Sequence, residues 1–155
     1  HSKNRQDMLQ NISEIKVTYT SKVKFSDMKA VSCSRDAEEI LRSIWNEGLI
    51  ELKEEFYILL LSRSNKVKGY YKVSEGGVSG TVVDPKIVFS VALKCTACGI
   101  ILAHNHPSGN LAPSVQDSEL TKKLIAGGKL LEISVLDHLI LTTDGYYSFA
   151  DEGVM

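Results

Sequence analysis

Two histidines separated by a single residue, His104 and His106, follow the apolar run 100–103. Side chains alternate along a strand, so both imidazoles would project from one face, with their backbones roughly 6 to 7 Å apart. Asp117 follows on the first turn of an expected helix. Two imidazoles and one carboxylate leave the fourth tetrahedral position of a zinc ion open, as a catalytic zinc site requires. The pattern therefore predicts that His104, His106 and Asp117 hold one Zn2+ ion per chain, although ligand type alone leaves iron or manganese open.

A metal-activated water also needs a base that accepts its proton and passes it to the leaving group. Glu54 and Glu55 precede an apolar strand and are the candidates for this base. Ser114, at the start of the expected helix, could donate a hydrogen bond to an oxyanion. The residues alone leave the plainer alternatives open. Glu54 could simply keep a strand end in water, Ser114 could be only a helix N-cap, and Asp117 only a first-turn charge.

Hydrophobic periodicity and capping signals predict the elements that must position these residues. The expected strands are 14–19, 56–61, 67–73, 78–83 (a short strand or an extended segment), 100–103, 133–142 and 146–149. The expected helices run from Asp36 to Gly48, from Pro85 to Gly99, and from Ser114 to the pair Gly127–Gly128, with Asp36 and Glu39 at capping-box spacing. This order predicts a single α/β domain, in which a mixed β-sheet is flanked by helices.

Length and composition are those of one globular domain. The chain has 155 residues and a formal net charge of -1, so it has no general attraction to nucleic acid or to an anionic membrane. No apolar run approaches the roughly 20 residues of a membrane helix. Residues 1–13 are expected to form a flexible N-terminus, and a first residue His1 is interpreted as a cloning remnant. The chain has three cysteines, a small and odd number that argues against a disulfide framework. The sparse cysteine content favours a reducing compartment such as the cytoplasm.

His138, Cys95 and Cys98 are further residues whose side chains could bind a metal. His138 lies inside an expected strand, where a hydrogen-bonded histidine in the core or near the site is favoured over a fourth ligand. Cys95 and Cys98 have Cys-x-x-Cys spacing within an expected helix, and the interpretation is buried, small side chains rather than a second metal site.

The motif from His104 to Gly109, followed by Pro113-Ser114 and Asp117, resembles the metal motif of the JAMM/MPN+ (JAB domain) zinc metallopeptidases. In detail it resembles the RadC branch of that superfamily. The resemblance covers roughly residues 34–153, and further matches are Gly80-Thr81, Leu102-Ala103, Leu136-Asp137-His138 and Tyr147-Ser148-Phe149.

The resemblance implies a role for each matching residue. It makes His104, His106 and Asp117 the metal ligands and Ser114 the residue that assists the oxyanion. The family's glutamate lies two residues before an aromatic, which corresponds to Glu54; Glu55 is the second choice, because it would face the other side of the strand.

The resemblance implies a zinc-dependent hydrolase of amide bonds, with a peptide or protein substrate, and a JAB/MPN-like, cytidine-deaminase-like domain over 14–155. RadC-like proteins often carry an N-terminal helix-hairpin-helix module, for which this chain has no room, so it resembles the short form. The alternative is a DNA-repair-associated accessory or nucleic-acid-binding protein without hydrolase activity, against which the neutral charge argues. An open strand edge could also pair two copies into a homo-oligomer.

Overall fold

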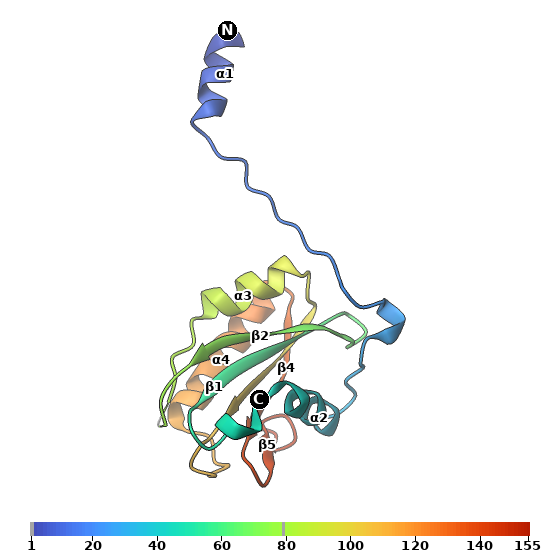
Figure 1. Cartoon of the computed structure of the whole chain (residues 1–155), viewed down its shortest axis with the longest axis vertical. Coiled ribbons are helices and arrows are strands. Elements are labelled where there is room, and N and C mark those ends of the chain that lie inside the picture. Colours follow the sequence, from blue (N-terminus) through green and yellow to red (C-terminus); the bar gives the residue numbers. More distant parts are fainter. Residues whose placement is uncertain (1, 79) are drawn as a thin grey trace.

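A five-stranded sheet carries the fold, and helices lie against both of its faces (Figure 1). The computed structural model describes residues 2–78 and 80–155. In spatial order the strands are β2 (Val67–Glu75), β1 (Glu55–Leu61), β3 (Gly99–Asn105), β4 (Ser134–Leu141) and β5 (Tyr146–Ser148). The α-helices are α1 (Ser2–Gln10), α2 (Ser34–Ile44), α3 (Pro85–Lys94) and α4 (Val115–Leu130), and short 3-10 helices cover Phe25–Asp27 and Glu47–Leu49.

The strand pairing confirms the predicted α/β class with a mixed sheet. Strands β3 and β4 are parallel, whereas the β1–β2, β1–β3 and β4–β5 pairs are antiparallel. None of the helices in the described ranges has the length and apolar character to cross a membrane.

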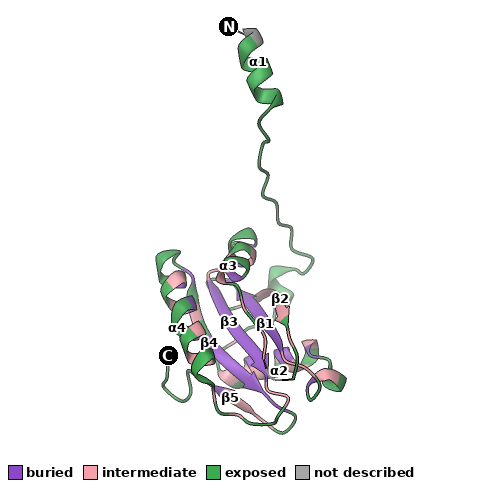
Figure 2. Cartoon of the chain, turned by 90° about the vertical axis from the view of Figure 1, so that its left-hand side faces the viewer, coloured by how far each residue is buried: buried purple, intermediate pink, exposed green. Residues whose placement is uncertain are grey.

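Both faces of the central strands are buried, which explains why β1 and β3 are continuous apolar runs (Figure 2). On one face of β1, Leu59 and Leu61 pack beneath α2. On the other face, Ile58 and Leu60 pack beneath α3 and α4. Each such side chain contributes about 1.5–3 kcal/mol when it is fully buried. The central strands therefore form a rigid platform whose ends can hold polar side chains in fixed positions.

The N-terminal segment differs from the prediction. A strand at 14–19 was wrong, because these residues are extended but have no partner strand within the described chain. Their apolar side chains remain exposed, at 82% for Ile15 and 71% for Val17. Alternation of residue types does not form a strand without a neighbour that accepts its hydrogen bonds. Within the segment 1–13 the structure contains helix α1, which stands away from the sheet (Figure 1).

Helix α2 begins and ends earlier than the sequence indicated. It starts at Ser34 with Cys33 as its N-cap, and it ends at Ile44 rather than at Gly48. The predicted capping box of Asp36 and Glu39 was wrong, because the Asp36 carboxylate accepts a hydrogen bond at 2.8 Å from the Ser32 N–H, ahead of the helix. The apolar side chains of the helix, among them Ala37 and Leu41, pack against the sheet.

Helix α3 begins as predicted, with Asp84 as its N-cap and Pro85 in its first turn, but it ends at Lys94 rather than at Gly99. Thr96 adopts a left-handed conformation with φ 53°, a position that glycine usually takes. The N–H of Ala97 then donates to the carbonyl of Ala92 at 2.9 Å and closes the helix. The pair Cys95 and Cys98 therefore lies after the helix, with Cys95 buried and Cys98 half-buried.

Helix α4 continues through Gly127 and Gly128 to Leu130, although the sequence suggested that these glycines end it. They mark close packing instead. A Cβ at Gly128 would collide with the carbonyl oxygen of Ile133. The N–H of Ile133 donates a hydrogen bond to the Gly128 carbonyl at 2.8 Å. The helix is therefore held directly against the chain that leads into β4.

The predicted strand at 78–83 is not formed among its described residues. Gly77 and Gly80 make an isolated bridge, and residues 81–83 continue without strand pairing; Ser79 lies outside the described residues. The expected strands 56–61, 67–73, 100–103, 133–142 and 146–149 all correspond to strands of the sheet.

The contact at Gly128 predicts a stability difference between neighbouring substitutions. Gly128→Ala should lower the free energy of unfolding by about 1–3 kcal/mol, because backbone must shift to admit the methyl group. The matched control is Gly127→Ala, whose new Cβ would lie 2.8 Å from the edge of the Phe89 ring. That ring is half-buried and can rotate, so this change should cost less. Urea unfolding measures both, and a Gly128→Ala protein as stable as wild type would contradict the packing argument.

Candidate metal centre

His104 and His106 lie where β3 leaves the sheet. His104 is paired with both β1 and β4, and the His106 N–H donates to the Leu141 carbonyl at 3.0 Å. The chain then turns, since the Gly109 N–H donates to the His106 carbonyl at 3.0 Å. Gly109 has φ 83°, which glycine adopts without a steric penalty. The two imidazoles converge, with their Nε2 atoms 2.9 Å apart.

Asp117 reaches the same point from the first turn of α4. Ser114 and Asp117 form a capping box: the Ser114 Oγ accepts from the Asp117 N–H at 3.0 Å, and the Asp117 carboxylate accepts from the Ser114 N–H at 2.8 Å. The carboxylate oxygens of Asp117 also lie 3.3 Å from His104 Nε2 and 3.2 Å from His106 Nε2. Asp117 therefore caps the helix and faces the histidines with the same carboxylate.

The spacing of these atoms fits a single tetrahedral metal. Zinc–ligand distances of about 2.0–2.1 Å in tetrahedral geometry separate neighbouring ligand atoms by about 3.3 Å. The observed separations lie close to that value: 2.9 Å between the two Nε2 atoms, 3.3 Å from His104 Nε2 to Asp117 Oδ1, and 3.2 Å from His106 Nε2 to Asp117 Oδ2. Two imidazole nitrogens and a carboxylate are also a donor set that zinc accepts in proteins. His104, His106 and Asp117 thus fit the predicted ion in both spacing and chemistry.

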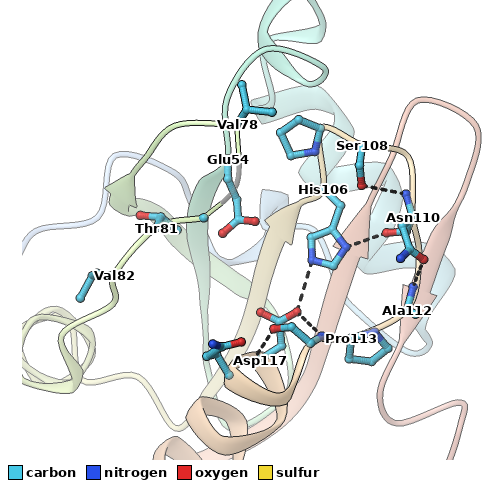
Figure 3. Close-up of a pocket in the computed structure, with 14 residues that line it drawn as sticks. Glu54, Val78, Thr81, Val82, His106, Ser108, Asn110, Ala112, Pro113 and Asp117 are labelled. Carbon is cyan, nitrogen blue, oxygen red and sulfur yellow. Dashed lines mark hydrogen bonds and ion pairs between the residues drawn. The ribbon is translucent and has the colours of Figure 1, made fainter.

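Glu54 faces this centre and Glu55 does not. One carboxylate oxygen of Glu54 and one nitrogen of each histidine lie within 4.8 Å of one another. Glu54, His106 and Asp117 point into a common space from three segments of the chain (Figure 3). The Glu55 side chain is buried away from this space and forms an ion pair with Lys72 at 2.9 Å. Glu54, and not Glu55, is therefore the glutamate that lies beside the converging side chains.

A cleft of about 790 Å³ opens beside Glu54, within the range of small-ligand and substrate sites. Its lining includes Glu54, Ser114 and Asp117, together with segments 80–82 and 106–108. Ser114 is exposed and stands at the rim. The cleft therefore opens directly onto the side chains of Glu54, His106 and Asp117.

The electrostatics of the site follow from these contacts. Burial raises the pKa of Glu54, and the nearby imidazoles His104 and His106 only partly offset it. The hydrogen bond with Asp117 raises the pKa of His106, against the opposing effect of burial. Burial would raise the pKa of Asp117, but the neighbouring imidazoles of His104 and His106 and the hydrogen bond from the Ser114 N–H outweigh this effect and hold that pKa well below its usual range. Asp117 is therefore ionised, and Glu54 is the carboxyl group that protonates more readily.

His138 lies behind His104, in agreement with its predicted place as a hydrogen-bonded histidine near the site. It is fully buried, and its Nε2 lies 2.8 Å from His104 Nδ1. Its Nδ1 lies 2.6 Å from the hydroxyl of Thr121 in α4, a residue that the sequence did not indicate. Desolvation and the neighbouring His104 hold the pKa of His138 well below its ordinary value. The ring is therefore neutral.

Asn105 is a second residue that sequence reasoning missed. It is fully buried, and its Oδ1 accepts from the Glu55 N–H at 2.8 Å. Its Nδ2 donates to the carbonyls of Ile50 and Lys53 at 2.8 and 2.9 Å. Asn105 thus ties the chain around Glu54 to the strand that bears the histidines. The sequence feature that could have identified Asn105 is its position between the two histidines. Side chains alternate along a strand, so the Asn105 side chain lies on the face of β3 opposite to theirs.

Comparison with known proteins gives one matching family. The profile described as the RadC-like JAB domain matches residues 31–154. A UPF0758 protein from Flavobacterium johnsoniae is 46% identical over 127 residues, which are 82% of this chain and 54% of that protein. A UPF0758 protein from Alkaliphilus metalliredigens is 36% identical over 140 residues, covering 90% of this chain and 58% of that protein.

A third relative, a UPF0758 protein from Porphyromonas gingivalis, is 45% identical over 104 residues, covering 66% of this chain and 46% of that protein. The chain therefore spans about half the length of these curated relatives.

The contacts of Asn105 predict that Asn105→Leu is strongly destabilising. Leucine keeps similar bulk but leaves the Glu55 N–H and the carbonyls of Ile50 and Lys53 without this partner. We expect the free energy of unfolding to fall by at least about 2 kcal/mol, because unpaired buried polar groups retain their desolvation cost. Urea unfolding of the variant and of wild type measures the difference.

Asn46→Leu is the control, because the Asn46 side chain also accepts a backbone hydrogen bond, from Gly48 at 3.0 Å, but is exposed. It should lose only about 0.5–1 kcal/mol. Equal losses in the two variants would show that Asn105 does not hold the segment around Glu54.

Proposed function

Because the chain belongs to the RadC-like JAB domain family, as its histidine motif predicted, we propose that it is a zinc-dependent hydrolase of amide bonds. The observation that carries the proposal is the convergence of His104, His106 and Asp117 beside an open cleft that Glu54 also lines. The substrate is a peptide or isopeptide bond of a peptide or protein.

In this proposal His104, His106 and Asp117 would hold the ion. A zinc ion there would supply Lewis acidity and would lower the pKa of a water molecule to about 7. The remaining chemistry belongs to side chains at the rim of the cleft, outside this ligand set.

Glu54 serves as general base and then as general acid. Its carboxylate lies close enough to both histidines to accept a proton from a water at the centre. Partial burial raises the pKa of Glu54. The carboxyl group can therefore keep the proton until it transfers the proton to the leaving amine. Glu55 is excluded from this role by its ion pair with Lys72.

Ser114 stabilises the developing oxyanion. Its Oγ accepts from the Asp117 N–H, so the lone hydroxyl proton remains available to a group in the cleft. A donor placed where charge develops contributes more in the transition state than in the ground state.

Zinc content tests the ligand set. Purified wild type should contain a single zinc ion per chain, and His104→Ala and Asp117→Ala should contain almost none by elemental analysis, because each removes a ligand. Glu55→Gln is the control that should retain zinc. Wild-type protein free of transition metal even after reconstitution with zinc would contradict the proposal.

Hydrolysis tests the base. Glu54→Gln should keep its zinc yet lose activity by at least about 100-fold, since glutamine cannot carry the proton. Glu55→Gln should keep most of the activity, because the Glu55 carboxylate is paired with Lys72 away from the cleft. Mass spectrometry of a pooled library of octapeptides and lysine-linked isopeptides measures cleavage. Similar loss in the two variants, or full activity of Glu54→Gln, would remove Glu54 from the mechanism.

A further inference from the structure

We propose that Thr121 and His138 form a positioning relay that fixes the tautomer of His104, so that His104 Nε2 presents a lone pair to the metal centre. The inference rests on the proposed function, because a metal is what that lone pair serves. It assigns roles to two residues of α4 and β4 that lie outside the cleft.

The direction of the relay is set at Thr121. The Thr121 hydroxyl donates to the backbone carbonyl of Asp117 at 2.7 Å. A hydroxyl has one proton, and a carbonyl can only accept. At its second contact, 2.6 Å from His138 Nδ1, the Thr121 oxygen must therefore accept. The proton in that contact belongs to His138 Nδ1.

The tautomer of His138 in turn determines which ring nitrogen of His104 carries a proton. The His138 ring is fully buried, stacked on Phe149 at 4.6 Å and edge-on to Phe56 at 5.6 Å between centroids. A neutral imidazole with a proton on Nδ1 has only a lone pair on Nε2. At 2.8 Å from His104 Nδ1, that lone pair accepts. His104 therefore carries its proton on Nδ1 and leaves Nε2 bare.

His106 reaches the same state through a different partner. Its Nδ1 lies 2.6 Å from the carbonyl oxygen of Asn110, which can only accept, so Nδ1 carries the proton. In its neutral form His106 therefore also has a bare Nε2, which faces that of His104 at 2.9 Å beside the Asp117 carboxylate. Two lone pairs cannot bond to each other, so with both rings neutral the arrangement suits a cation between them.

The relay also links two of the three ligands. It begins on the backbone of Asp117 and ends on the imidazole of His104. The reverse direction would place a proton on His104 Nε2, where it would occupy the coordination site. Outer hydrogen bonds of this kind fix both the tautomer and the ring orientation of a ligand.

The first test reads the tautomer directly. Nitrogen-15 chemical shifts of the histidine rings in metal-free wild type, at mildly alkaline pH, distinguish a protonated Nδ1 from a protonated Nε2. We expect His104 to be protonated on Nδ1. A dominant Nε2-protonated form would overturn the relay, whether or not any variant folds.

The second test compares Thr121→Val with Thr121→Ser. Valine has nearly the same shape but accepts no hydrogen bond, so His138 should turn to its Nε2-protonated form and reverse the tautomer of His104. Zinc affinity, measured by competition with a chromophoric chelator, should fall by about 10- to 100-fold. Serine keeps the hydroxyl and should preserve both the shifts and the affinity. Thr121→Val with wild-type shifts and affinity would overturn the proposal.

These readouts separate the relay from the proposed function. A wild type that binds no zinc but shows the expected His104 tautomer overturns the hydrolase and leaves the relay in place. Normal zinc binding with the opposite tautomer overturns the relay alone.

Discussion

The close approach of two imidazoles and one carboxylate at the end of β3 is the constraint on which the site depends. The Nε2 atoms of His104 and His106 are 2.9 Å apart, and each lies 3.2 to 3.3 Å from one of the two carboxylate oxygens of Asp117. Strand β3 is buried on both faces, and the capping box fixes Asp117 at the start of α4. Rigidity on both sides keeps these polar atoms close together, and the proposed cation between them would stabilise the arrangement.

The parts of this centre that follow from short-range rules could be predicted from the sequence. The alternation of a strand places His104 and His106 on one face, and the N-cap position of Ser114 places Asp117 on the first turn of the same helix. Each of these relations spans one element, so its spacing in the chain determines its geometry. The same holds for the buried strands, whose apolar runs admit few other positions in an α/β fold.

The parts that depend on distant contacts could not be predicted. Asn105 bonds to a segment fifty residues earlier in the chain, and Thr121 acquires its role only because α4 lies against His138. The residues 14–19 alternate like a strand yet have no partner strand within the described chain. The sequence suggests that Gly128 ends a helix. In the structure it lies inside α4, where the missing side chain allows the helix to pack against the residues just before β4. In each case the contact that determines the outcome is made with another element of the fold, which the local sequence does not specify.

Anomalous difference density at the zinc absorption edge, from crystals grown with zinc, tests the central claim most directly. The account predicts one peak within about 2.0–2.2 Å of His104 Nε2, His106 Nε2 and an Asp117 oxygen. A peak elsewhere on the chain, or none at this position in zinc-saturated crystals, would contradict it.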